Sequence, residues 1–176
     1  MNGRISVDSK PGEGSTFRVS VMLPRTGAEP AFAAPDLRDT AWAMSQANVE
    51  AFKRAFDAIN SRDAEALLAE LDPEVEWHGA ILMAMGGDRT VYRGHEGVRE
   101  WLRDLYETLS EFHADYPEIL DLGDRTVAIG VVRGRGRASD AEIESPHGTV
   151  VEFKDGKGIR IRTYLDPKEA LEAAGL

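Results

Sequence analysis

The sequence contains no cysteine, which excludes a disulfide framework and any metal site built on thiolates. It also lacks an apolar run of about 18 residues, so a transmembrane helix is not expected. The first residues do not combine a basic segment with an apolar core, and no secretory signal is visible. These absences predict a cytoplasmic protein with no membrane partner.

Positive charge is scarce relative to negative charge. Asp and Glu number 31 against 21 Lys and Arg, which gives a net charge of −10. Five basic and five acidic side chains balance within residues 1–44, so the whole excess falls on residues 45–176. Because a strongly acidic domain repels the phosphate backbone, we expect no nucleic-acid partner.

The clearest pattern that is present lies in residues 92–109. Its apolar side chains recur at helical spacing: Val98, Trp101, Leu102, Leu105 and Leu109. Charged side chains occupy the other positions, so the segment is predicted to be an amphipathic helix. Such a helix must bury its apolar stripe, and the strand-like segments on either side of it are the candidates.

Helical and strand patterns follow one another along the rest of the chain. Helices are predicted over residues 46–60, with Ser45 as N-cap, and after Asp63, with the second helix stopped by Asp72-Pro73. One strand is predicted over residues 74–78, followed by a loop or irregular strand to residue 91. Four more strands are predicted between residues 112 and 165, and a last short helix over 168–174. This order predicts an α+β domain in which helices pack on one face of an antiparallel sheet.

The first 43 residues have a different character. Residues 3–24 alternate on both sides of a Pro-Gly-Glu-Gly turn and predict a β-hairpin. This hairpin, including the run Gly14–Phe17, resembles the last hairpin of a sensor histidine kinase ATPase domain. The Asn-bearing helix and the Asp-bearing glycine motif of such kinases are absent, so no ATP or magnesium site is expected. Residues 25–43 have linker composition, and residues 44–176 form the main predicted domain. We interpret residues 1–43 as a fusion remnant or gene-boundary artefact that the domain does not need.

Four segments of the main domain carry a family resemblance: residues 71–79 (LDPEVEWHG), 92–102 (YRGHEGVREWL), 134–139 (GRGRAS) and 158–176 (GIRIRTYLDPKEALEAAGL). Residues 45–176 resemble a SnoaL-like member of the nuclear transport factor 2-like superfamily. The resemblance implies a cone fold, in which helices cover the concave face of a curved antiparallel sheet and enclose an apolar pocket. It also implies a homodimer.

The resemblance implies no single activity. The superfamily includes ketosteroid isomerases, polyketide cyclases, epoxide hydrolases and non-catalytic binding domains. The isomerase's catalytic aspartate aligns with Trp77 and its oxyanion-hole tyrosine with Ala55. Because both positions are apolar here, ketosteroid isomerisation is not predicted.

Pairing of the last four strands sorts their side chains into two faces. If Val151 lies opposite Ile161, and Phe153 opposite Ile159, then His147, Thr149 and Thr163 share the pocket face. A turn at Ser139-Asp140 would place Arg137 opposite Glu142 and Arg135 opposite Glu144. The other face would then expose an apolar patch that invites a second copy: Val127, Ile129, Val131 and Val150.

The candidate site lies on the pocket face. The predicted ligand-binding residues are Trp77, Trp101, Tyr106, His147, Thr149 and Thr163. His147 is the candidate catalytic residue, as a general base or a polar anchor, and its alternative is a histidine satisfied by a structural hydrogen bond. His113 and Asp115 form either an acid–base pair or part of a solvated strand edge.

These residues favour a domain that binds a small hydrophobic molecule. The alternative is an acid–base enzyme of the isomerase, epoxide hydrolase or cyclase type. A polar pair deep in the pocket would favour the enzyme. No metal and no cofactor are expected, because the histidines and carboxylates lack the spacing of a metal site.

Overall fold

The computed structural model describes residues 3–10, 14–21 and 37–176, with side chains from residue 46 onward. The chain divides into two units, Met1–Ala34 and Pro35–Leu176. In the first unit, strands β1 (Gly3–Lys10) and β2 (Gly14–Val21) pair as an antiparallel hairpin. The expected hairpin therefore forms.

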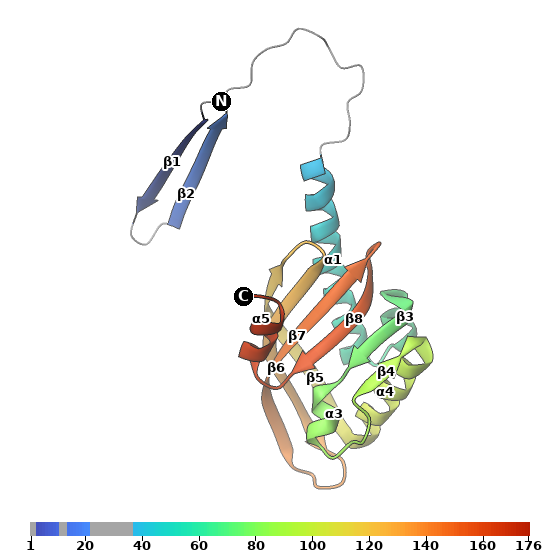
Figure 1. Cartoon of the computed structure of the whole chain (residues 1–176). Helices are drawn as coiled ribbons and strands as arrows, with labels where there is room; N and C mark the ends of the chain where they lie inside the picture. The colour runs from blue at the N-terminus through green and yellow to red at the C-terminus, as the bar shows by residue number, and fades with distance from the viewer. Residues whose placement is uncertain (1–2, 11–13, 22–36) are drawn as a thin grey trace. The chain divides into compact units, whose positions relative to one another are not determined.

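The second unit is an α+β domain (Figure 1). Its helices are α1 (Leu37–Ser61), α2 (Ala64–Ala69), α3 (Ala80–Ala84), α4 (Gly94–Thr108) and α5 (Pro167–Ala173). Its strands are β3 (Leu71–His78), β4 (Val91–Arg93), β5 (Leu109–Asp121), β6 (Arg125–Gly136), β7 (Glu142–Lys154) and β8 (Lys157–Tyr164).

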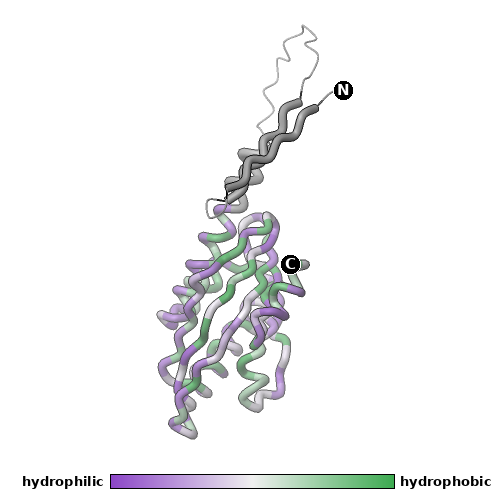
Figure 2. The backbone as a smooth tube through the Cα atoms, turned by 90° about the vertical axis from the view of Figure 1, so that its left-hand side faces the viewer, coloured by the Kyte–Doolittle hydropathy of each residue, from purple (hydrophilic) through white to green (hydrophobic). Residues whose placement is uncertain are grey.

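The six strands form one curved sheet in the order β4-β3-β8-β7-β6-β5. All neighbouring strands run antiparallel except β3 and β8, which are parallel and are separated in the sequence by α3, β4, α4 and strands β5–β7. Hydrophobic and hydrophilic residues alternate along the long strands (Figure 2), as expected for a sheet with two different faces. The cone fold predicted from the sequence is confirmed.

Helix α1 begins at Leu37, earlier than the sequence pattern predicted. Residues 37–43, expected to belong to the linker, are helical, and Ser45 lies inside the helix instead of capping it. Asp63 does cap α2, since its Oδ1 accepts a hydrogen bond from Ala66 N at 3.0 Å.

The concave inner face of the sheet carries the main core. Buried residues of α1, α2, α3 and α4 pack there against inward strand positions, and Trp77, Phe52 and Leu105 are among the largest fully buried side chains. Trp77, Ile161, Val151 and Thr126 form one inward row across β3, β8, β7 and β6. The apolar stripe from which α4 was predicted is buried as expected, and Val98 and Leu105 are fully covered.

Helix α5 packs on the opposite, outer face of the sheet, in front of β6 and β7 in Figure 1. Ala170 of α5 is fully buried against Val127 and Val150. The expectation of an exposed apolar patch at these valines is therefore wrong, because the chain's own last helix covers them. Ile129 is partly buried against the same cluster.

The register of the β6–β7 hairpin also differs from the prediction. Arg133 pairs with Glu144 and Arg135 with Glu142, so each arginine lies two positions from its expected partner. The connecting loop is longer than the predicted turn at Ser139-Asp140. A shift of two residues leaves every side chain on its face, and the assignment of faces is therefore unaffected.

Candidate functional site

A small polar group lies on the inner face beneath α1. Tyr116 of β5 reaches across β6 to Thr149 of β7, and their hydroxyl oxygens are 2.8 Å apart. Thr149 is fully buried, and burial raises the pKa of Tyr116 well above its ordinary value. Tyr116 is therefore a neutral hydroxyl that can donate or accept a hydrogen bond throughout the physiological range.

His147 lies two residues before Thr149, on the same face of β7. Its side chain is 3% exposed, and its ring centroid is 6.3 Å from that of Tyr116. Burial lowers the pKa of His147 to about 4, so the imidazole is neutral at physiological pH. Its Nδ1 atom is buried and has no hydrogen-bond partner among the described residues. Nδ1 is therefore a buried polar atom that is unsatisfied within the described part of the chain.

Close approach of β5 to β6 creates this arrangement. Strand β5 is bulged between Asp115 and Glu118, and Tyr116 lies within the bulge. Gly130 of β6, opposite His147, faces the bulge, and a Cβ at this glycine would lie 1.8 Å from the carbonyl oxygen of Asp115. The absence of a side chain at Gly130 lets the β5 backbone cross the inner face and carry Tyr116 toward Thr149.

A groove of about 340 Å³ runs between α1 and β5 above this group. Its apolar walls include Phe52 and Phe56, whose rings contact the Tyr116 ring edge-on at centroid distances of 5.4 and 4.8 Å. The full lining is Phe52, Lys53, Phe56, Asp57, Asn60, His113, Ala114, Asp115, Tyr116 and Ile119. The groove thus combines aromatic walls with a polar floor, as ligand sites commonly do.

Asn60 fixes the two sides of the groove to each other. Its amide nitrogen donates to the carbonyl oxygen of Ala114, and its amide oxygen accepts from Ala114 N, both at 2.8 Å. The side chain thereby pairs with the edge strand β5 as a neighbouring strand would. Helix α1 is held at a fixed distance from β5 at the point where the groove opens.

The predicted aromatic walls at Trp77 and Trp101 fill the core instead of lining a large cavity. Their ring centroids are 4.2 Å apart, and the residues are 1% and 3% exposed. The cavity lined by Trp77 holds only about 10 Å³. Both indole Nε1 atoms are buried without a hydrogen-bond partner among the described residues. The structure therefore offers the groove beside α1 as the larger space.

Two other predicted ligand-binding residues have structural partners. The Tyr106 hydroxyl donates to the carbonyl oxygen of Ile59 and joins α4 to the end of α1, and burial raises its pKa to about 12. Thr163 donates to the carbonyl oxygen of His78 at 3.1 Å and accepts from Ala80 N at 2.7 Å. Its hydroxyl thus ties the end of β3 to the start of α3. Of the six predicted site residues, His147 and Thr149 lie in the polar group beside Tyr116, and Trp77 and Trp101 contact each other in the core.

Sequence reasoning missed Tyr116 and Asn60. Phe112, Ala114 and Tyr116 alternate with polar residues along β5, a pattern that marks the inward face. His113 and Asp115, which the sequence offered as an acid–base pair, are exposed on the other side of the strand and line the groove. Asn60 gives no such signal, because its role depends on where the edge strand lies.

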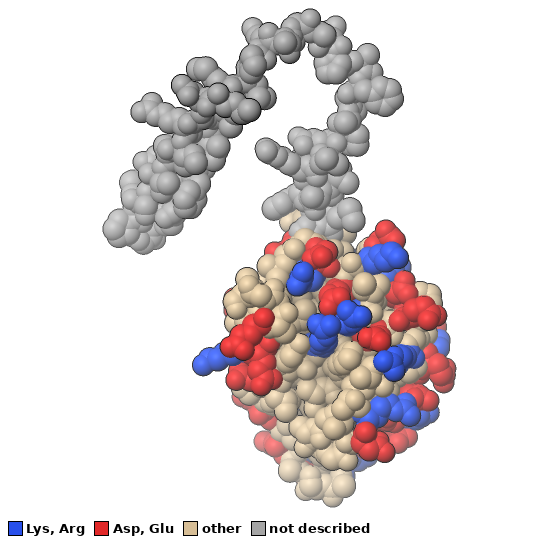
Figure 3. Space-filling view, in the orientation of Figure 1, with Lys and Arg blue, Asp and Glu red and all other residues tan. Residues whose placement is uncertain are grey.

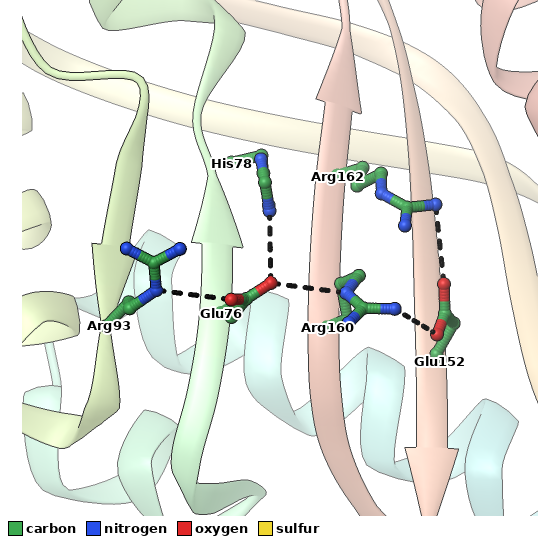
Figure 4. Close-up of polar contacts among 6 residues, drawn as sticks. All are labelled: Glu76, His78, Arg93, Glu152, Arg160 and Arg162. Atoms are coloured by element: carbon green, nitrogen blue, oxygen red, sulfur yellow. Dashed lines mark hydrogen bonds and ion pairs between the residues drawn. The ribbon is translucent and has the colours of Figure 1, made fainter.

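The outer face carries a charged row across five strands. Arg93, Glu76, Arg160, Glu152 and Arg125 lie in register from β4 to β6. Figure 4 shows Glu76 between Arg93 at 3.2 Å and Arg160 at 3.3 Å, and Arg160 also contacts Glu152 at 3.1 Å. Arg93 and Arg160 hold the pKa of Glu76 below its ordinary value. The row is part of a surface on which both signs of charge are interspersed (Figure 3).

Arg133 and Arg135 of β6 form cross-strand ion pairs with β7. Arg133 Nε lies 2.8 Å from Glu144, and Arg135 lies 2.9 Å from Glu142. No three His, Cys, Asp or Glu side chains in the described part of the chain gather as metal ligands. None of the described helices is long and apolar enough to cross a membrane.

Comparison with known proteins gives a match to one family and to its fold. Residues 52–161 match the family model of the SnoaL-like domain. No protein of curated function matches the chain significantly.

Solved structures similar to the chain share this fold. An NTF2-like protein of unknown function from Burkholderia pseudomallei has a TM-score of 0.63 at 22% identity, over 72% of this chain and 95% of that one. TerC, co-crystallised with polyporic acid, has a TM-score of 0.62 at 24% identity, over 74% and 99%. A protein of ketosteroid isomerase-like fold from Catenulispora acidiphila, in complex with trimethylamine, has a TM-score of 0.58 at 16% identity, over 72% and 93%.

Proposed function

Because the chain belongs to the family of SnoaL-like domains, we propose that it binds a small, largely apolar molecule in the groove between α1 and β5. The groove above Tyr116, whose hydroxyl is held by buried Thr149, is the observation that carries the proposal. Phe52 and Phe56 supply apolar walls, and His147 Nδ1 supplies an unused hydrogen-bonding position behind Tyr116. A planar ring system with a carbonyl or hydroxyl group fits this chemistry.

A thermal-shift and calorimetric titration tests this proposal. The probe panel is polyporic acid, which TerC was crystallised with, together with an aromatic lactone and a steroid. At least one probe should bind, and Tyr116→Phe should weaken it by about 0.5–1.5 kcal/mol, the usual net value of one hydrogen bond. Tyr164→Phe makes the same chemical change on the outer face, beside α5, and should leave affinity unchanged. The proposal fails if no probe binds, or if the two variants behave alike.

The alternative function is an acid–base enzyme that uses the same group. Its support is the buried proximity of His147, Tyr116 and Thr149. A histidine whose pKa is about 4 is a weak general base near neutral pH, because catalysis is most effective when the pKa lies near the working pH. This mismatch favours His147 as a ligand anchor. Turnover of any bound probe that His147→Ala abolishes, without loss of folding, would reverse that preference.

The homodimer expected from the family resemblance remains a proposal, with a different supporting surface. The alternating charges of the outer row are self-complementary: two copies related by a two-fold axis beside Arg160 would place arginines opposite carboxylates. Sedimentation equilibrium at micromolar concentration should then show a dimer that weakens with salt. Arg160→Glu should give monomers, whereas Arg103→Glu on α4, 61% exposed at its side chain, should not. A monomeric wild-type chain would contradict the proposal.

A further inference from the structure

Among the described residues, the groove is lined by acidic side chains without partners and by one basic side chain that has a partner. Asp57 of α1 and Asp115 of β5 both line it, both are exposed, and neither side chain has an ion pair or hydrogen bond within the described part of the chain. Lys53 is the one Lys or Arg among the lining residues, and its ammonium lies 2.9 Å from a carboxylate oxygen of Glu50. The lining therefore presents two unpaired carboxylates and one cation, which forms an ion pair with Glu50.

The polar groups deeper in the groove do not compensate. Tyr116 and Thr149 are neutral hydroxyls that bond to each other. Asn60 uses its amide nitrogen and its amide oxygen on the backbone of Ala114. The imidazole of His113 lines the opening of the groove. An entering anion would find hydrogen-bond donors on this floor but no counter-charge.

We infer that the groove selects uncharged aromatic ligands and rejects the corresponding carboxylates. The inference rests on the proposed function, because it names the class of molecule that the same groove accepts. A carboxylate that enters an apolar cleft loses hydration, and here it would also be repelled by Asp57 and Asp115. A neutral amide or lactone keeps its carbonyl acceptor for Tyr116 without either cost.

A pair of probes with one scaffold tests the inference. Calorimetry at about pH 8 and physiological ionic strength compares 2-naphthamide with 2-naphthoate, at a pH where imidazoles are neutral. The amide is expected to bind at least about fivefold more tightly, a ratio within the range of partly screened charge repulsion. A naphthoate that binds as tightly as the amide, or more tightly, would overturn the inference while leaving the proposed groove in place.

Charge-removing variants identify the cause of the selectivity. Asp57→Asn with Asp115→Asn should reduce the ratio of the two affinities by at least about twofold, because the repulsion is gone while the carboxylate's loss of hydration remains. Asp155→Asn with Glu172→Gln removes the same net charge from exposed positions outside the groove and should leave the ratio unchanged. An unchanged ratio in the groove variant refutes the assignment. If neither naphthalene probe binds, the inference fails; the proposed function fails only if the polyporic acid, lactone and steroid panel also fails.

Discussion

His147 shows how one residue's surroundings set its chemistry. Side chains alternate between the two faces along a strand, so His147, two residues before the inward Thr149, also lies on the inner face. The sequence alone does not reveal that burial lowers its pKa to about 4 or that Nδ1 lacks a partner among the described residues. Those properties depend on tertiary packing, including the β5 bulge that brings Tyr116 beside it. The combination favours a neutral anchor over a proton-transfer group.

We predict that His147 makes the protein less stable in acid. The unfolded histidine has a pKa near 6.5 and the folded one a pKa of about 4, so the unfolded chain binds more protons in this range. The free energy of unfolding should therefore fall as pH drops from about 6.5 through 4, by about 2 kcal/mol between pH 7.5 and 5. Urea titrations of His147→Leu should show a smaller fall in the free energy of unfolding over the same pH range, because the contribution of His147 is gone.

The matched control for that measurement is His113→Gln, which replaces an exposed histidine. The pH dependence of its stability should follow the wild type, because this variant leaves the buried His147 in place. A decline of the same size in His147→Leu and in the wild type would show that His147 does not titrate between the two states.

At the scale of elements, most of the secondary structure could be predicted, while the irregular features could not. Helix α4 and the meander β5–β8 follow directly from apolar spacing. The longer α1 and the two-residue register difference at Arg135 arise where periodicity is weak or where a loop length decides the pairing. Tyr116 was missed for a related reason. Pro117 next to it favours an edge strand or a bulge, and β5 is both, but the contact of Tyr116 with Thr149 also depends on how β6 and β7 lie beside the bulge.

The β5 bulge gives a prediction that compares two glycines on one strand. Gly130→Ala would place a Cβ 1.8 Å from the carbonyl oxygen of Asp115, so β5 must move away from β6. Gly134→Ala meets its nearest neighbour, the Leu109 side chain, at 3.5 Å, an ordinary contact. The first variant should lose at least about 2 kcal/mol of stability or fail to fold, and the second should change it by less than about 0.5 kcal/mol.

Chemical denaturation of both alanine variants measures the two stability changes and tests this prediction. Where Gly130→Ala still folds, it should also bind the groove ligand less well, because displacement of β5 moves Tyr116 away from Thr149. Equal stabilities of the two variants would mean that β5 can shift without loss. The bulge would then not be what positions Tyr116.

At the scale of the whole molecule, the sequence predicted the layers but not that α5 covers part of the outer face of the sheet. A short C-terminal helix was expected, yet its sequence pattern does not predict that Ala170 packs against Val127 and Val150 and buries them. The match at this point is steric: a Cβ at Gly148 would lie 2.4 Å from the Ala170 Cβ, so the glycine makes room for the helix. Such a fit between segments distant in sequence emerges only when the sheet has formed.

The last prediction concerns the independence of the second unit. The boundary between the units follows Ala34, and α1 is helical from Leu37, so a fragment beginning at Pro35 keeps the whole helix. We predict that residues 35–176 melt at the same temperature as the full chain, since the β1–β2 hairpin pairs only with itself among the described strands.

A fragment that begins at Met44 lacks the first turns of α1 and is the informative comparison. Because short helices lose stability when they are trimmed, it should melt at or below the temperature of the Pro35 fragment, measured by calorimetry. A Pro35 fragment that melts several degrees below the full chain would show that residues 1–34 stabilise the domain.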